Sequence, residues 1–149
     1  MEPVSGTEAA VRLTGMISAR YQVHAYSIDL TAKQIYALDP AGQVDFGGTE
    51  YSASARVPVA SLRRNREDRY EWWDLSRGAY MLEFNENLAL APNEIAILEP
   101  DERLVRCGAT HPTAFLRGQG ERLETMLMVG TLNVHIKQNA RVSRLRVFR

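Results

Sequence analysis

Hydrophobic and polar residues alternate with a period of two along much of the chain, which is the pattern of half-buried β-strands. In the segment 79–90, Tyr80, Leu82 and Phe84 fall on one face, while Met81 and its polar neighbours fall on the other. The same alternation places Leu127 and Val129 opposite Met126 and Met128 in a later segment. By this pattern we expect strands at 24–36, 43–46, 79–90, 95–98, 124–129, 134–137 and 142–148.

Turn-forming residues separate these strands at intervals of roughly ten residues. A short N-terminal helix is expected after the cap-type residue Ser5, and a second helical turn is expected from Thr14. Many short strands with regular turns predict an all-β barrel or sandwich, and no internal repeat or second domain interrupts residues 1–149. The expected turns lie at 39–42, 47–48, 74–78, 130–131 and 138–139.

Charge and composition narrow the classes of partner. The chain has 149 residues, with 18 basic and 18 acidic side chains, so no global charge favours nucleic acid or an anionic membrane. Residues 1–25 carry charges without a long apolar run, so we expect no signal peptide and no membrane span, and a cytoplasmic location. The one cysteine, Cys107, excludes an internal disulfide, and its position beside Gly108 predicts a buried, inert thiol.

Two polar or aromatic stretches have both a functional and a structural interpretation. The segment 51–70 mixes arginines with acidic residues, which favours a solvated, mobile loop over a phosphate-binding arm. Trp72 and Trp73 are neighbours in an expected strand, so at most one of them can face a given pocket, and packing is the favoured role.

The segment 99–119 carries an ordered set of motif residues: Pro100, Leu104, Arg106 and Gly108, followed by a Thr-Ala pair at 113–114. It resembles the central motifs of the dUTPase and dCTP deaminase superfamily, in which Pro-Arg-Ser-Ser-Leu-x-Arg-x-Gly is followed by Thr-Ala and Asp-Pro-Gly-Tyr. Three further segments resemble other superfamily motifs in the same order, namely 27–31, 78–86 and 139–148. The resemblance implies a dUTPase-like β-clip, a distorted, jelly-roll-like barrel. It also implies a homotrimer with nucleotide or small-molecule sites at the subunit boundaries.

The polar residues of the central motif depart from the superfamily pattern. In register, Asp101 stands at the position of the phosphate-binding arginine, and Glu102 and Arg103 stand at the two serines. A carboxylate ~4 Å from a triphosphate would repel it by about 4 kcal/mol per unit charge at an effective dielectric near 20. The resemblance thus implies a weakened phosphate site.

The catalytic positions are also replaced. Allowing for a one-residue deletion, Arg117 stands at the aspartate that activates water in dUTPases, and Gln119 at the tyrosine that packs on the deoxyribose. A protonated arginine cannot act as a general base. The deaminase glutamate falls at or near Met126, and Glu124 lies roughly 6.5 Å away along the strand.

The remaining candidates have mainly structural interpretations. Asp29 is the one acid that matches a superfamily position, and we expect it to cap a turn or to pair with an arginine. Arg106 could reach a phosphate, but we expect it to form a structural ion pair, with Asp101 or Glu102 or across a subunit boundary. Thr113 belongs to the nucleotide-site positions. No cofactor is expected, with magnesium only if dUTPase activity is retained, and His24, His111 and His135 lack the spacing of a metal site.

Three hypotheses remain open. The first is a catalytically degenerate homotrimeric relative of the nucleotide enzymes with a structural, binding or regulatory role. The second is an active dUTP diphosphatase or dCTP deaminase with relocated acids, drawn from Asp29, Glu121 and Glu124. The third is a binding module for a small ligand other than a triphosphate. The sequence favours the first over the second, because the phosphate-binding residues and the base are replaced together.

Overall fold

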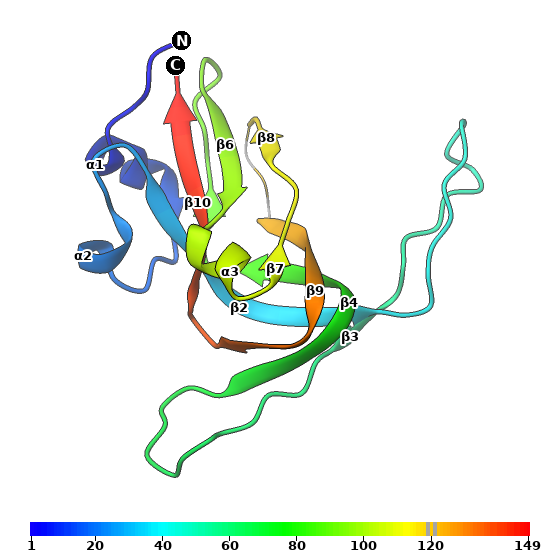
Figure 1. Cartoon of the computed structure of the whole chain (residues 1–149). Coiled ribbons are helices and arrows are strands. Elements are labelled where there is room, and N and C mark those ends of the chain that lie inside the picture. Colours follow the sequence, from blue (N-terminus) through cyan, green and yellow to red (C-terminus); the bar gives the residue numbers. More distant parts are fainter. Residues whose placement is uncertain (119, 121) are drawn as a thin grey trace.

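The computed structural model describes residues 1–118, 120 and 122–149. Its centre is a curled antiparallel sheet with the strand order β7-β9-β4-β2-β10-β6-β8 (Figure 1). The five longer strands are β2 (Ile28–Leu38), β4 (Trp72–Phe84), β6 (Ile95–Pro100), β9 (Glu124–Lys137) and β10 (Arg141–Phe148). The shorter strands are β1 (Leu13–Thr14), β3 (Arg56–Pro58), β5 (Asn87–Leu88), β7 (Ala109–Thr110) and β8 (Ala114–Leu116). The all-β prediction is confirmed.

The core lies inside the curl of the sheet. Its fully buried side chains come mainly from the long strands, and they include Ile28, Leu30, Trp73, Leu82, Leu98, Leu127 and Leu145. The predicted faces of β9 and the predicted apolar face of β4 are confirmed, because Tyr80, Leu82, Phe84, Leu127 and Val129 are buried while Met126 and Met128 are exposed. On the opposite face of β4, Glu83 is buried as well, so the alternation does not hold there. In β2 the alternation does not separate inside from outside, since Asp29 and Thr31 are buried as well as Ile28 and Leu30. Thr31 and the Oδ2 atom of Asp29 find hydrogen-bond partners within the protein, as described below.

Two predicted turns are wrong. Residues 74–78 lie within β4 and residues 130–131 lie within β9, and the two strands pair from Trp72↔Lys137 to Glu83↔Glu124. A register shift between Ser76 and Gly78 takes up the irregularity that the turn-type residues produce. The long β4–β9 ribbon therefore runs through both predicted turns. The predicted turn at 138–139 is confirmed, with Asn139 at a positive φ of 65°.

The N-terminal segment contains three short helical elements, α1 (Gly6–Ala9), η1 (Ala10–Arg12) and α2 (Ala19–Gln22). The Ser5 side chain accepts a hydrogen bond from the Glu8 N–H, so the predicted cap is confirmed. Thr14 belongs to β1 rather than to a helical turn, and β2 begins at Ile28 instead of residue 24. The predicted strand at 43–46 is reduced to one bridge, Gln43↔Ser52.

A helix that the sequence pattern did not predict, α3 (Glu102–Arg106), follows β6. Asp101 is its N-cap, and its side chain accepts a hydrogen bond from the Arg103 N–H. Leu104 is buried and fixes the helix on the body. Five residues are too few for a hydrophobic period to be visible, so only the cap residue could have indicated this helix.

Two long hairpin segments extend from the body in Figure 1. Residues 39–55, called the arm from here on, leave the end of β2 and project to one side. Residues 59–71 form the second extension and lead into β4, and most of them are exposed. The solvated loop predicted for 51–70 is interrupted by β3, which lies within those bounds. Within the described residues, no helix has the length and apolar character needed to cross a membrane.

Candidate functional site

A cluster of buried charges lies where β2, β10 and the start of α3 meet. Asp29 of β2 is only 2% exposed, and its Oδ2 atom lies 2.8 Å from His24 Nε2 and 3.3 Å from Arg141 Nη1. Its Oδ1 atom lies 3.6 Å from Arg144 Nε. Antiparallel pairing places Arg144 of β10 directly opposite Asp29, which explains this contact. The expectation that Asp29 pairs with an arginine is confirmed.

Asp101 is the second acid of this cluster and is 4% exposed. Its Oδ1 atom accepts hydrogen bonds from the Arg103 N–H at 2.9 Å and from Arg103 Nε at 3.4 Å. Its Oδ2 atom lies 3.4 Å from Arg144 Nη2. Arg144 therefore lies between two buried carboxylates, and each carboxylate also contacts a second arginine. We call Asp29, Asp101, Arg103, Arg141 and Arg144 the charge cluster.

The charge cluster lines an open pocket of about 300 Å³, to which His24 and Glu102 also contribute. Three carboxylates and three guanidinium groups balance along its wall, so the pocket carries little net charge. Two of its atoms, Asp29 Oδ1 and Arg144 Nε, are buried without a hydrogen-bond partner in the part of the chain that the structure describes. Ion pairing at 3.6 Å meets their charge but not their hydrogen-bonding capacity.

The other predicted site residues lie outside this cluster. Glu102 is exposed and pairs with Arg106 at 2.5 Å, so the expected structural pair of Arg106 is confirmed. Thr113 and Arg117 flank β8 and are exposed, and neither makes a hydrogen bond or ion pair to the charge cluster in the described structure. Gln119 lies outside the described residues, as does Glu121.

Glu124 was a candidate for a relocated catalytic acid, but its carboxylate pairs with Arg56. Its two oxygens receive hydrogen bonds from Arg56 at 2.6 and 2.7 Å. The hydrogen bond from Arg56 lowers the pKa of the Glu124 carboxyl, which favours a paired anion rather than a proton-accepting base.

A second polar network that sequence reasoning missed lies behind the charge cluster. Glu86 is fully buried and accepts hydrogen bonds from both the N–H and the hydroxyl of Thr31 at 2.6 Å. Asn85 Nδ2 donates to Thr31 Oγ1 and to Asn139 Oδ1, both at 2.9 Å. Burial raises the pKa of the Glu86 carboxyl despite these hydrogen bonds. These hydrogen bonds anchor β2, the strand that carries Asp29, through Thr31. In the sequence, only the adjacent Asn85 and Glu86 could have indicated the network.

The three histidines lie in separate environments. His111 Nε2 is 2.7 Å from Ser143 Oγ, and burial lowers the pKa of its ring. His135 pairs with Asp74, and His24 with Asp29, a proximity that sequence spacing did not reveal. Within residues 1–118, 120 and 122–149, no group of three or more His, Cys, Asp or Glu side chains is placed to hold a metal ion. Asp29 already faces two guanidinium groups, so the charge cluster does not suit a magnesium ion.

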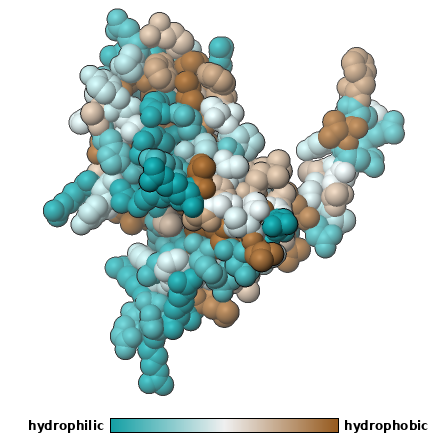
Figure 2. Space-filling model, viewed as in Figure 1, coloured by the Kyte–Doolittle hydropathy of each residue, from teal (hydrophilic) through white to brown (hydrophobic). Residues whose placement is uncertain are grey.

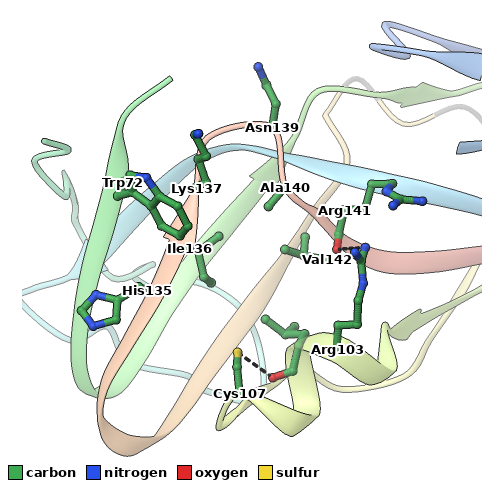
Figure 3. Close-up of a pocket in the computed structure, with 11 residues that line it drawn as sticks. Trp72, Arg103, Cys107, His135, Ile136, Lys137, Asn139, Ala140, Arg141 and Val142 are labelled. Carbon is green, nitrogen blue, oxygen red and sulfur yellow. Dashed lines mark hydrogen bonds between the residues drawn. The ribbon is translucent and has the colours of Figure 1, made fainter. Parts of the chain in front are cut away.

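Cys107 does not have the predicted buried position, because its side chain is exposed. Its Sγ atom donates to the Leu104 carbonyl at 3.1 Å, just beyond the end of α3. There it lines a second pocket of about 370 Å³ beside Trp72, which we call the Trp72 pocket (Figure 3). Trp73 points into the core while Trp72 lines this pocket, as expected for neighbours in a strand.

The chain is similar in sequence to several archaeal proteins that share one name. The chain is 33% identical over 135 residues to a Methanosarcina acetivorans protein named probable deoxyuridine 5'-triphosphate nucleotidohydrolase, a match that covers 89% of this chain and 75% of the relative. Proteins of the same name from Methanosarcina mazei and Methanococcoides burtonii are 34% and 30% identical over 135 and 132 residues, covering 89% and 87% of this chain and 75% and 74% of each relative. No protein-family model matches the chain.

A solved structure shares the fold. The 2'-deoxycytidine 5'-triphosphate deaminase from Agrobacterium tumefaciens superimposes with a TM-score of 0.70 over 97% of this chain, at 15% sequence identity. The present chain spans about half of that deaminase chain, 47% of its length. This similarity shows a common dUTPase-like fold, which the central motifs and the strand pattern predicted.

Proposed function

The chain belongs to the deoxyuridine 5'-triphosphate nucleotidohydrolase (dUTPase) family, and from this premise we propose that it is a catalytically degenerate member. It keeps the family fold, no longer hydrolyses dUTP or deaminates dCTP, and has a structural, binding or regulatory role in deoxyuridine or deoxycytidine triphosphate metabolism. As in the resemblance described above, the proposed assembly is a homotrimer with ligand sites at the subunit boundaries.

The state of Asp101 is the observation that carries this proposal. Its buried carboxylate caps α3 through the Arg103 N–H and also faces Arg144. Both kinds of donor, a helix N–H and a guanidinium group, are those that a phosphate would otherwise use. An anion supplied by the protein therefore competes with a triphosphate for the same donors. Binding a triphosphate would require breaking these contacts and placing further negative charge beside two buried carboxylates.

The proposed loss of hydrolysis has a second support in the replaced base. Arg117 follows β8 and is exposed. Its guanidinium group stays protonated at any physiological pH, so it cannot accept a proton from water. Glu124 is held by Arg56, which leaves no described acid from the relocated set other than Asp29. Asp29 in turn contacts two arginines.

Two observations favour other functions. The relatives named above as probable nucleotidohydrolases are at least 30% identical, which keeps active dUTP hydrolysis as a second candidate. The unpartnered Asp29 Oδ1 and Arg144 Nε favour a third, namely binding of a small ligand that carries both a donor and an acceptor. Both atoms are buried, so such a ligand reaches them only when the Asp29 and Arg144 side chains move. A zwitterionic ligand would do so without adding net charge to the pocket.

Titration calorimetry of substitutions at position 101 with a non-hydrolysable dUTP analogue tests the proposal. In the Asp101→Ser variant, serine still caps α3 while the carboxylate is removed, so Arg144 becomes available to an anion. We expect no measurable binding of the analogue by the natural chain and measurable binding by the variant, because the Arg144 guanidinium then no longer faces the Asp101 carboxylate.

Glu99→Gln is the matched control, because it removes one negative charge two residues away on β6 and lies outside the pocket lining. This control is expected to bind no better than the natural chain. Tight binding of the analogue by the natural chain would contradict the proposal. So would equal, undetectable binding by the natural chain and the Asp101→Ser variant.

A further inference from the structure

The arm carries large apolar side chains that nothing in its own chain covers. Phe46 is 108% exposed and Val44 is 88% exposed, and Tyr51 is exposed on the returning segment. Figure 2 shows hydrophobic surface on this arm, separated from the body of the molecule. Scattered single apolar residues on a surface are ordinary, but three on one projecting hairpin form a patch that requires an explanation.

The backbone of the arm is nevertheless well defined. Gln43 and Ser52 exchange two backbone hydrogen bonds, at 2.8 and 3.0 Å. The Asp45 carboxylate accepts from the N–H groups of Gly48 and Glu50 and so holds the tip. A two-stranded hairpin of this kind is marginally stable in water on its own. An ordered hairpin with an uncovered aromatic tip is therefore suited to a surface that receives it.

The charge of the arm indicates the character of that surface. Residues 39–55 contain three acidic side chains, Asp39, Asp45 and Glu50, and no lysine, arginine or histidine. Two of the three acids flank Phe46 in the tip. A complementary surface has an apolar centre and a basic rim.

The Trp72 pocket has this composition. Leu104, Ile136 and Val142 contribute apolar side chains to its lining. Arg103, Lys137 and Arg141 contribute cations (Figure 3). Arg103 and Arg141 also face Asp101 and Asp29 of the charge cluster, so Lys137 is the lining cation that the cluster does not pair. No carboxylate is among its described lining residues. The Lys137 Nζ atom lies 5.5 Å from the Trp72 ring centre, and the Arg64 guanidinium lies 3.8 Å from it. A volume of about 370 Å³ is at the small end of the ligand-pocket range of roughly 300–1,000 Å³, which suits one aromatic side chain.

We propose that the arm of one copy inserts Phe46 into the Trp72 pocket of a second copy of this chain. The aromatic ring of Phe46 packs against Trp72 and the apolar lining, while Asp45 and Glu50 face Lys137. About eight residues in extended conformation separate the end of β2 from the tip, so the arm reaches roughly 25 Å beyond the sheet.

The contact joins two different surfaces of the same chain, so it is heterologous. Each copy donates one arm and offers one pocket, and successive contacts close into a ring if the rotation between copies permits it. A tip-to-tip contact between two arms would instead be isologous and would stop at a dimer. The number of copies joined through the arm therefore distinguishes the two arrangements.

Cysteine cross-linking tests the proposal directly, because Cys107 is the only cysteine and lines the Trp72 pocket. In a Phe46→Cys variant, an inserted tip brings the new thiol against Cys107 of the neighbouring copy. We expect mild oxidation, or a short bifunctional thiol reagent, to give covalent species larger than a dimer on a non-reducing denaturing gel. Because the Phe46 side chain contacts nothing within its own chain, the substitution leaves the fold intact.

Two controls make the result specific. The Phe46→Cys/Cys107→Ser double variant is expected to lose the cross-link, and Arg66→Cys, exposed in the second hairpin segment, is expected to form none. Cross-linking of the double variant to a dimer would show a tip-to-tip contact and overturn the proposal. Cross-linking that is equally efficient from position 66 would also overturn it, because it would reflect random collision.

A measurement without cysteine chemistry gives the second readout. Phe46→Ser is expected to raise the subunit dissociation constant at least about tenfold by light scattering over a concentration series, as the aromatic contact is lost. Unchanged assembly in Phe46→Ser would overturn the proposal. Neither result depends on whether the protein hydrolyses or binds a nucleotide.

Discussion

Arg12 and Glu94 show how single residues of this protein fix distant segments to one another. Arg12 Nε and Nη2 donate to the two Glu94 oxygens at 2.8 and 2.6 Å, and the Ala91 N–H donates to Oε2 at 2.9 Å. The pair joins the N-terminal helical segment to the chain just before β6. The hydrogen bond from Arg12 lowers the pKa of the Glu94 carboxyl from its ordinary value of 4.5 to about 2.

This lowered pKa predicts a pH-dependent contribution to stability. A carboxyl with a depressed pKa in the folded protein stabilises it above the unfolded pKa, and the contribution is lost as the pH falls through the folded pKa. We therefore expect Glu94→Gln to lower the free energy of unfolding at pH 7, with a difference from the natural chain that shrinks between pH 4.5 and about 2. Urea denaturation at several pH values measures this difference. Glu67→Gln, at an exposed position, is the control, and a Glu94→Gln effect that stays constant down to pH 2 would contradict the assignment.

At the site, ion pairs between residues close in sequence could be predicted, and ion pairs between residues far apart in sequence could not. The pair of Arg106 with Glu102 is one helical turn long, so spacing alone indicated it. Arg141 reaches Asp29 across 112 residues, and only the pairing of β2 with β10 brings them together. Cys107 was predicted to be buried from its neighbour Gly108. The thiol is exposed because it follows α3, a helix that the sequence pattern did not reveal.

Among the elements, the connection from α3 to β7 depends on one glycine. Gly108 has a φ of +106°, and a Cβ atom there would lie 2.4 Å from Thr131 Oγ1 on β9. This explains why glycine ends the Leu-x-Arg-x-Gly motif, since both the backbone angle and the close approach to β9 exclude a side chain.

The Gly108→Ala substitution is therefore expected to destabilise the protein by about 1–3 kcal/mol. Gly130→Ala is the matched control on the adjacent strand, where a Cβ atom would lie at an ordinary 3.6 Å from the Gly108 carbonyl oxygen. The control is expected to change stability by less than about 1 kcal/mol. Thermal and urea unfolding of the two variants give the comparison. Equal effects at both positions would indicate that neither the positive φ nor the contact with Thr131 matters.

Turn prediction shows the limit of sequence reasoning at this scale. Residues 74–78 and 130–131 have turn composition, yet both segments lie within long strands: residues 74–76 and 78 pair with β9, and residues 130–131 fall in the register shift between Ser76 and Gly78. When turn-type residues of two paired strands lie opposite each other, a β-bulge can accommodate them without ending either strand. The sequence of one strand does not show which residues of the other strand lie opposite it. The arm continues from the end of β2, and the second hairpin segment leads into β4.

For the whole molecule, period-two patterning was sufficient to predict the all-β class, and the ordered motifs indicated the dUTPase-like fold. The burial of both faces at the start of β2 was not predictable, because the partners of Thr31 and Asp29 are Glu86, between β4 and β5, and Arg144 of β10. The proposed function depends on the contacts of Asp101 with Arg103 and Arg144. In this proposal the fold is retained, and these charges neutralise one another in the pocket that a triphosphate would otherwise occupy.

Pyrophosphate release from dUTP, in the presence of magnesium, is the most direct measurement of this account. Purified protein at micromolar concentration is incubated with dUTP, and a dUTPase of known activity serves as the positive control for the assay. The account predicts no pyrophosphate above the background of an enzyme-free sample. Turnover near 1 s⁻¹, within the usual enzyme range of roughly 1–1,000 s⁻¹, would contradict it and identify the chain as an active dUTPase.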